Sequence, residues 1–142
     1  MKRLAVLSTL VFLVLIAAAC APSGTPFPAE YVPADPGNPA SVVNAFFTAR
    51  SAFNLDAAMQ YVNDSTVIVN PRGTHTGVDQ IREMVQSMMD ENFQFEITSS
   101  QTNGDQVTFK MQAYQNGQAV EMVNGQAVVQ GGVIASMTLE VE

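Results

Sequence analysis

The chain has 142 residues, of which 47% are hydrophobic and 13% are charged, and its formal net charge is −7. That length allows one domain of ordinary size, and the composition excludes an intrinsically disordered chain. The cations that follow residue 19 are scattered along the sequence: Arg50, Arg72, Arg82 and Lys110. Because they form no basic patch, we exclude nucleic acid as a partner.

The N-terminal stretch "MKRLAVLSTLVFLVLIAAAC" has the anatomy of a secretory signal peptide. Lys2 and Arg3 precede an apolar run and three alanines, and the run is shorter than the roughly 20 residues that span a bilayer. Cys20, the only cysteine, follows the alanines directly. The arrangement resembles a bacterial lipoprotein signal, which implies cleavage after residue 19 and a lipid on Cys20. An ordinary signal peptide with an incidental cysteine is the alternative.

The segment after the signal peptide is rich in proline and glycine. Residues 21–39 hold six of the seven prolines, a composition typical of an extended tether. Loss of Lys2 and Arg3 with the signal peptide takes the net charge from −7 to −9. We therefore expect residues 1–19 to be a signal peptide, residues 20–38 a lipid-anchored tether outside the cytoplasm, and residues 39–142 one folded domain.

Helical spacing of apolar residues dominates the first half of the domain. Asn38 followed by Pro39 predicts the start of a first helix, whose apolar residues include Phe46 and Phe47. Asn54 predicts the cap of a short second helix. "TVIVNP" predicts a strand that ends before Pro71, and "GVDQIREMVQSMMDEN" predicts a third helix with apolar residues at i, i+3, i+4 and i+7.

After Asn92 the apolar period changes from helical spacing to two. The turn signals "TNGD", "QNGQ" and "QGG" separate the alternating runs, which predicts an antiparallel meander of four strands. Asn124-Gly125 falls inside the longest run and predicts a β-bulge. Three helices followed by these strands predict an α+β fold, with helices packed on a strongly curved antiparallel sheet that forms a cone around a cavity.

The stretch "VVNAFFTARSAFNLDAAMQYVNDSTVIVNPRGTHTGVDQIREM", residues 42–84, resembles the nuclear transport factor 2-like superfamily, in its SnoaL-like and ketosteroid isomerase-like branch. The resemblance covers residues 39–142. It implies the cone-shaped fold but does not select one activity, because the superfamily includes isomerases, cyclases, hydrolases and domains without known activity.

The resemblance also tests the isomerase chemistry residue by residue. The position of the carboxylate base is Asn70, the position of the phenol in the oxyanion hole is Phe46, and the position of its partner acid is Asn124. An amide cannot take a proton at neutral pH, and phenylalanine has no hydroxyl. We therefore exclude an isomerase of this type.

His75, the only histidine, is the remaining candidate for acid–base chemistry. It is either a general acid or base at the cavity mouth or a residue of the pocket rim, and we favour the rim. One histidine, one lipid-blocked cysteine and dispersed acids predict no metal site and no cofactor.

The sequence thus predicts a lipoprotein domain without catalysis that binds a small apolar ligand or a protein partner. The alternatives are a cyclase-type or hydrolase-type enzyme that uses His75, and a module for homodimerisation. The candidate ligand-pocket residues come from the first helix, the first strand and its turn, the third helix and the long strand: Phe46, Asn70, His75, Val85, Met88 and Asn124.

Overall fold

The computed structural model describes residues 31–142. The expected signal peptide, Cys20 and the tether as far as residue 30 lie outside the described residues. The elements in chain order are α1 (Pro39–Ser51), α2 (Leu55–Met59), β1 (Val67–Asn70), β2 (Gly73–Thr76), α3 (Gly77–Asp90), β3 (Phe93–Asn103), β4 (Gln106–Gln115), β5 (Gln118–Gln130) and β6 (Val133–Val141).

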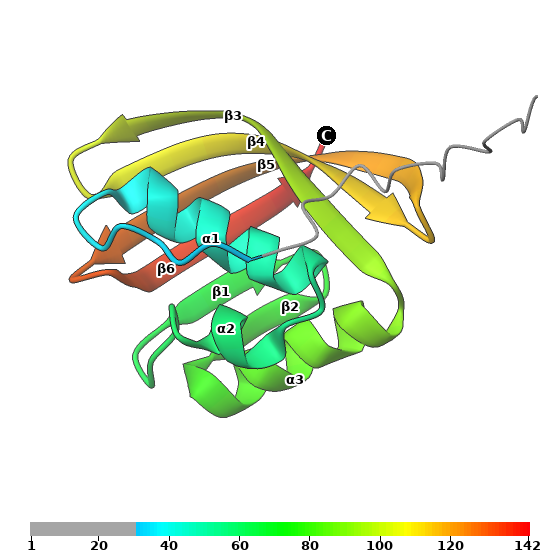
Figure 1. The fold of residues 1–142 in the computed structure, drawn as a ribbon, viewed down its shortest axis with the longest axis horizontal. Helices are drawn as coiled ribbons and strands as arrows, with labels where there is room; N and C mark the ends of the chain where they lie inside the picture. The colour runs from blue at the N-terminus through cyan, green and yellow to red at the C-terminus, as the bar shows by residue number, and fades with distance from the viewer. Residues whose placement is uncertain (1–30) are drawn as a thin grey trace, which may run out of the picture.

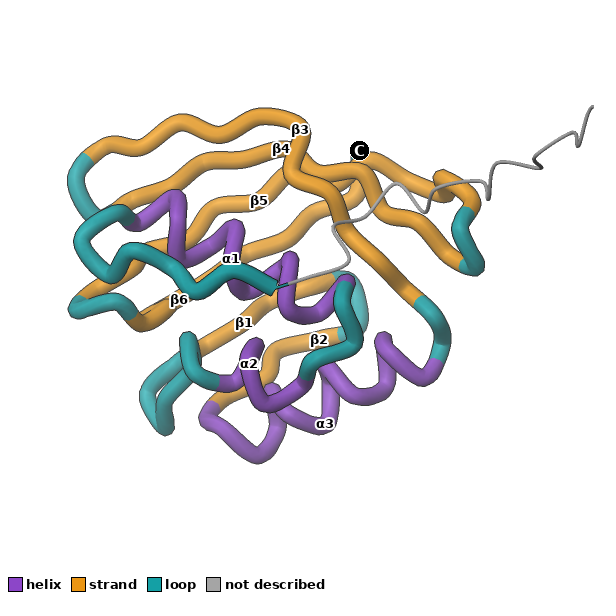
Figure 2. Tube along the Cα trace, in the orientation of Figure 1, coloured by secondary structure: helices purple, strands orange, loops and turns teal. Residues whose placement is uncertain are grey.

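The six strands form one sheet in the order β2-β1-β6-β5-β4-β3. The last four strands are an antiparallel meander, and β1 joins β6 in parallel. Figure 1 shows the sheet bending around α1, with α2 and α3 near the β1–β2 end. Figure 2 shows the same layers by type of secondary structure. The predicted α+β class, with three helices packed on a curved antiparallel sheet, is confirmed.

The first two helices begin at the predicted caps. The Asn38 side chain accepts a hydrogen bond from the Ser41 amide at 3.3 Å, and Pro39 occupies the first helical position of α1. The Asn54 side chain accepts from the Ala57 amide at 3.1 Å at the start of α2. Both caps satisfy amides that a helix leaves free at its N-terminus.

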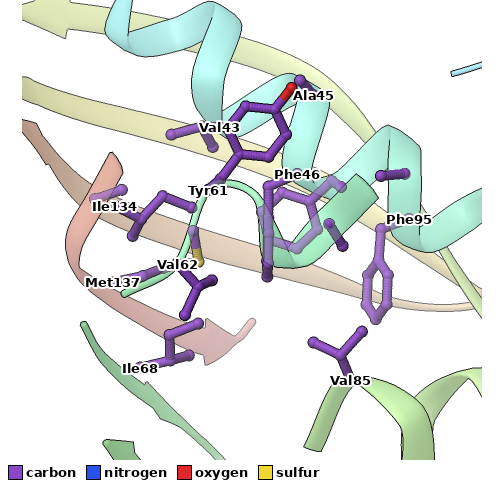
Figure 3. Packing of buried hydrophobic residues seen from close by; sticks show 14 of the residues in the cluster. Val43, Ala45, Phe46, Tyr61, Val62, Ile68, Val85, Phe95, Ile134 and Met137 are labelled. Carbon is purple, nitrogen blue, oxygen red and sulfur yellow. The ribbon is translucent and has the colours of Figure 1, made fainter. Parts of the chain in front are cut away.

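The core lies between α1 and the concave face of the sheet. Phe47 packs against Phe95 of β3 and Phe109 of β4, with ring centroids 5.7 and 5.6 Å apart. Figure 3 shows Phe46 among other apolar side chains of this core, with Val85 of α3 next to Phe95. These aromatic contacts hold α1 in a fixed position against the strands, which in turn fixes the residues at its C-terminal end.

β2 is absent from the sequence prediction, which assigned residues 71–77 to a turn and the start of a helix. In the structure, β2 forms a hairpin with β1 across Pro71 and Arg72, and His75 pairs with Ile68. β2 is an edge strand of four mostly exposed residues. Because it buries almost no apolar surface, its sequence carries no alternating pattern from which it could be recognised.

The predicted bulge at Asn124-Gly125 is wrong. The pairing is regular there, with Lys110 opposite Asn124 and Phe109 opposite Gly125, and the register of β5 shifts elsewhere along the strand. Gly125 instead makes room for the Phe109 ring. A Cβ atom at position 125 would lie 2.8 Å from Cε1 of this ring and nearer still to Cζ. The glycine therefore serves a close side-chain approach within a regular strand.

Residues 31–38, the last part of the predicted tether, lie against the domain. The hydroxyl groups of Tyr31 and Tyr61 form a hydrogen bond, and the Ala34 amide donates to the Tyr61 hydroxyl at 3.0 Å. The Asp35 amide donates to the Ser41 hydroxyl at 3.0 Å. These contacts fix the chain against α1 and the segment that follows α2 before the first helix begins, which the proline-rich composition did not indicate.

Ser51 joins the end of α1 to the edge of the sheet. Its buried hydroxyl donates to the Phe95 carbonyl at 2.9 Å and accepts from the Phe95 amide at 2.8 Å. We expect Ser51→Ala to lower the free energy of unfolding by about 1–2 kcal/mol, because both backbone groups lose their partner. Urea denaturation measures the change. Ser100→Ala, at an exposed position of β3, the strand that contains Phe95, is the control. Equal midpoints for the two variants would contradict this role.

Candidate functional site

A cavity of about 130 Å³ lies between the C-terminal end of α1, the β1–β2 turn, α3 and the concave face of the sheet. Most of its walls are apolar. The residues that line it are Arg50, Asn70, Pro71, Arg72, Met88, Phe93, Phe95, Met111, Glu121, Val123, Leu139 and Val141. Mainly apolar walls with a few polar groups are the usual lining of a ligand site.

Arg50 is the buried charged residue of this cavity, with 2% of its surface exposed. Its guanidinium carbon lies 4.5 Å from the ring centroid of Phe95, 5.2 Å from that of Phe47 and 5.4 Å from that of Phe46. The faces of aromatic rings attract a cation, and this attraction strengthens where water is excluded. The rings therefore offset part of the cost of burying the charge.

The hydrogen bonds of Arg50 are incomplete. Its Nη2 group donates to the Met88 sulfur at 2.8 Å, and its Nε group, although buried, has no acceptor among the described residues. Burial lowers the pKa of Arg50 to about 9, with no contribution from a carboxylate. At neutral pH the guanidinium is therefore charged, and a weak sulfur acceptor is its only hydrogen-bond partner among these residues.

The second cation of the cavity is neutralised. Arg72 forms two hydrogen bonds with the Glu91 carboxylate, at 2.6 and 2.7 Å, and lies over the Phe93 ring. These bonds lower the pKa of Glu91 and raise the pKa of Arg72. Glu121 also contributes to the raised pKa of Arg72 through its negative charge. The charge of Arg72 is thus balanced by nearby carboxylates, whereas the charge of Arg50 is not.

Asn70, at the position of the isomerase base, lines the cavity with 6% of its surface exposed. Its amide nitrogen donates to the Met84 sulfur at 3.0 Å, and its oxygen accepts from the Arg72 amide at 2.8 Å. Asn70 therefore holds the β1–β2 turn and forms part of the wall.

The structure separates the six predicted pocket residues. Asn70 and Met88 line the cavity. Phe46 and Val85 are fully buried and pack in the core behind it, because α1 and α3 turn these side chains toward the strands (Figure 3). Phe46 and Val85 therefore pack behind the residues that line the cavity and do not line it themselves.

His75 lies outside the cavity. It belongs to β2 and borders a shallow surface depression with Arg72, Gln80 and Glu83. Its buried Nε2 atom has no hydrogen-bond partner among the described residues. An acid–base catalyst needs a partner that orients the ring and a substrate within reach, so this placement gives the enzyme hypothesis no support.

Asn124 lies on the convex face of the sheet, where Thr108, Gln126 and Thr138 surround it. Its neighbours Val123 and Gly125 are buried on the concave face, and Val123 lines the cavity. The resemblance placed the partner acid of the oxyanion hole at Asn124, one residue after Val123, which faces the cavity. Because side chains alternate along a strand, that single step moves the residue to the opposite face.

Arg50 is the site residue that the sequence prediction missed. Its position was informative, because Arg50 follows Phe46 by four residues and Phe47 by three. That spacing places a cation on the buried face of an otherwise apolar helix. A charged residue on such a face indicates either a buried ion pair or a ligand, and the described residues provide no carboxylate within ion-pair distance of Arg50.

Residues 31–142 contain no group of three or more His, Cys, Asp or Glu side chains that could hold a metal ion. None of the helices in this described part combines the length and the apolar character needed to cross a membrane.

Comparison with known families identifies the class of protein. Residues 43–136 match the SnoaL-like domain, and the chain belongs to this family. No curated protein is a significant match. The family match therefore assigns no particular activity to this chain.

Solved structures support the same fold. An NTF2-like protein of unknown function from Cytophaga hutchinsonii has 19% identity and a TM-score of 0.63, over 74% of this chain and 90% of that one. A putative polyketide cyclase from Sinorhizobium meliloti has 21% identity and a TM-score of 0.62, over 80% and 100%. An LEH-like epoxide hydrolase from M. tuberculosis has 19% identity and a TM-score of 0.63, over 71% and 80%. Identities this low establish a shared fold only.

Proposed function

We propose that this protein is a membrane-anchored, extracytoplasmic lipoprotein whose SnoaL-like domain binds a small, mainly apolar ligand without catalysing a reaction. The observation that carries the proposal is the cavity of about 130 Å³ with mostly apolar walls. For scale, an apolar protein cavity of about 150 Å³ is large enough for benzene.

The absence of catalysis is supported by the polar groups around the cavity. Asn70 replaces the carboxylate base that the family resemblance calls for, and both ends of its amide already bind protein atoms. His75 borders a different surface. A domain that retains the cavity and lacks an oriented acid–base pair is suited to binding.

Methionine methyl NMR tests the binding proposal directly. Met88 and Met111 line the cavity, whereas the buried Met137 does not. Nitrobenzene, a small neutral probe, is titrated into the full chain in phosphatidylcholine nanodiscs. We expect saturable shifts of the Met88 and Met111 methyl signals and little change at Met137. Absence of saturable shifts at the two lining methionines would reject a ligand-binding cavity.

The lipid anchor has an independent test. We expect Cys20→Ala to abolish incorporation of labelled palmitate in a bacterial host, because acylation requires the cysteine thiol. The parent chain should carry the label and sediment with membranes. Equal labelling of the parent and the variant would show that Cys20 is not the acylated residue.

A further inference from the structure

The two cations inside the cavity differ in how their charges are balanced. Arg50 and Arg72 are the cations that line it. Arg72 has Glu91 as a bidentate partner, whereas Arg50 has a thioether and three aromatic rings. A buried charge without a counterion is costly, and proteins generally pair such charges. The cavity is the space next to Arg50 in which a counterion can be accommodated.

The donors of Arg50 define the chemistry of that counterion. A guanidinium presents its N–H groups in a planar fork that matches the two oxygens of a carboxylate. The buried Nε group has no acceptor, and Nη2 has only a sulfur acceptor. A carboxylate would supply oxygen acceptors to a cation that now lacks them.

The remaining walls define the rest of the ligand. Phe93, Leu139 and Val141 offer apolar surface for a hydrocarbon body. Glu121 also lines the cavity, and its negative charge disfavours a second acidic group on the ligand. The cavity of about 130 Å³ limits the body to about the size of one aromatic ring.

We infer that the cavity binds a small hydrophobic monocarboxylate, with its carboxylate against the Arg50 guanidinium and its hydrocarbon body along the apolar wall. This inference rests on the proposed binding function and specifies the class of ligand. The charge of the ligand, rather than its size alone, then determines the affinity.

The test compares benzoate with nitrobenzene, a planar neutral molecule of nearly the same shape. Both are titrated into the full chain in nanodiscs at about pH 7, with the Met88 and Met111 methyl signals as the readout. We expect benzoate to bind at least about tenfold more tightly, because its carboxylate accepts charge-assisted hydrogen bonds from Arg50, which are stronger than hydrogen bonds between neutral groups. Arg50→Met should weaken benzoate at least about tenfold and change nitrobenzene less than about threefold.

Two controls separate the charge of Arg50 from general effects. Arg82→Met removes an exposed cation that pairs with Asp56 outside the cavity, so it should leave both affinities unchanged. In the parent chain, benzoate binding should weaken as the pH rises above about 9, because Arg50 loses its proton there, while nitrobenzene binding stays constant. The pH profile needs no variant and tests the role of Arg50 even if Arg50→Met does not fold.

Three results would overturn the inference, and they have different meanings. Equal binding of benzoate and nitrobenzene to the parent chain would reject the carboxylate and leave the proposed binding function intact. If neither probe shifts the Met88 and Met111 signals, the proposed function fails and the inference fails with it. Benzoate affinity that is unaffected by Arg50→Met would also reject the pairing with Arg50.

Discussion

Gly125→Val is expected to lower the free energy of unfolding by about 3 kcal/mol, at the upper end of the cost of overpacking a core. The Phe109 ring occupies the space that a side chain at position 125 would need. Phe109 is itself buried and packs on Phe47, so its ring has no free space to move into. Because valine normally favours a strand, strand propensity alone would predict a gain in stability, and the expected loss points to the clash with Phe109.

Urea denaturation of a matched set checks this prediction. Gln126→Val, at the exposed neighbouring position, should change the unfolding free energy by less than about 0.5 kcal/mol. Phe109→Leu combined with Gly125→Val should cost less than the sum of the two single changes by about 1–3 kcal/mol, because the leucine leaves room for the new side chain. Additive costs would show that the glycine serves another purpose.

Arg50→Met is expected to raise the free energy of unfolding of the ligand-free protein by about 2 kcal/mol at neutral pH, within the range seen when buried ion pairs are replaced by apolar residues. Methionine fills a similar space without a charge to desolvate. The variant loses the attraction of Arg50 to three aromatic rings, which limits the gain. A site residue that lowers stability is typical of a binding function.

The difference in unfolding free energy between Arg50→Met and the parent chain should decrease as the pH rises. Burial lowers the pKa of Arg50 from its ordinary value to about 9, so above pH 9 the unfolded chain binds more protons than the folded one. Stability from this group therefore rises as the pH rises above about 9. The advantage of Arg50→Met should shrink by roughly 1 kcal/mol between pH 8 and pH 10, at about 1.4 kcal/mol per pH unit above the folded pKa.

Urea denaturation of both proteins at the two pH values measures this change. Arg82→Met serves as the exposed control and should show no comparable pH-dependent difference. If Arg50→Met instead lowers the unfolding free energy at neutral pH, the aromatic rings alone compensate the buried charge, and the need for a counterion disappears.

The regular elements were predictable because their patterns are strong. Alternating apolar residues and Asn-Gly turns predicted the meander from β3 to β6, a capped helical pattern predicted α1, and helical spacing alone predicted α3. β2 was not predictable, since it is short and polar and pairs with one strand, β1, at the edge of the sheet. Periodicity predicts strands that bury a face, and an exposed edge strand buries none.

The site was less predictable than the fold. Of the predicted pocket residues, Asn70 and Met88 line the cavity, and Asn124 lies on the convex face of the sheet. Sequence alternation identifies two faces of a strand, but it does not say which face lines a cavity when both carry apolar residues. Arg50 is difficult to recognise from the sequence, because one cation in an apolar helix resembles scattered surface charge. Its spacing from Phe46 and Phe47 is the signal that places it on the buried face of α1.

The contact between Arg50 and Met88 also makes the site sensitive to oxidants. Met88 is partly exposed at the cavity wall, and its sulfur accepts from the guanidinium at 2.8 Å. Oxidation to the sulfoxide would place a strongly polar S=O oxygen beside the same N–H group. That oxygen would compete with a carboxylate for Arg50, so oxidised protein should retain its fold and lose affinity for acidic ligands until a reductase restores the thioether.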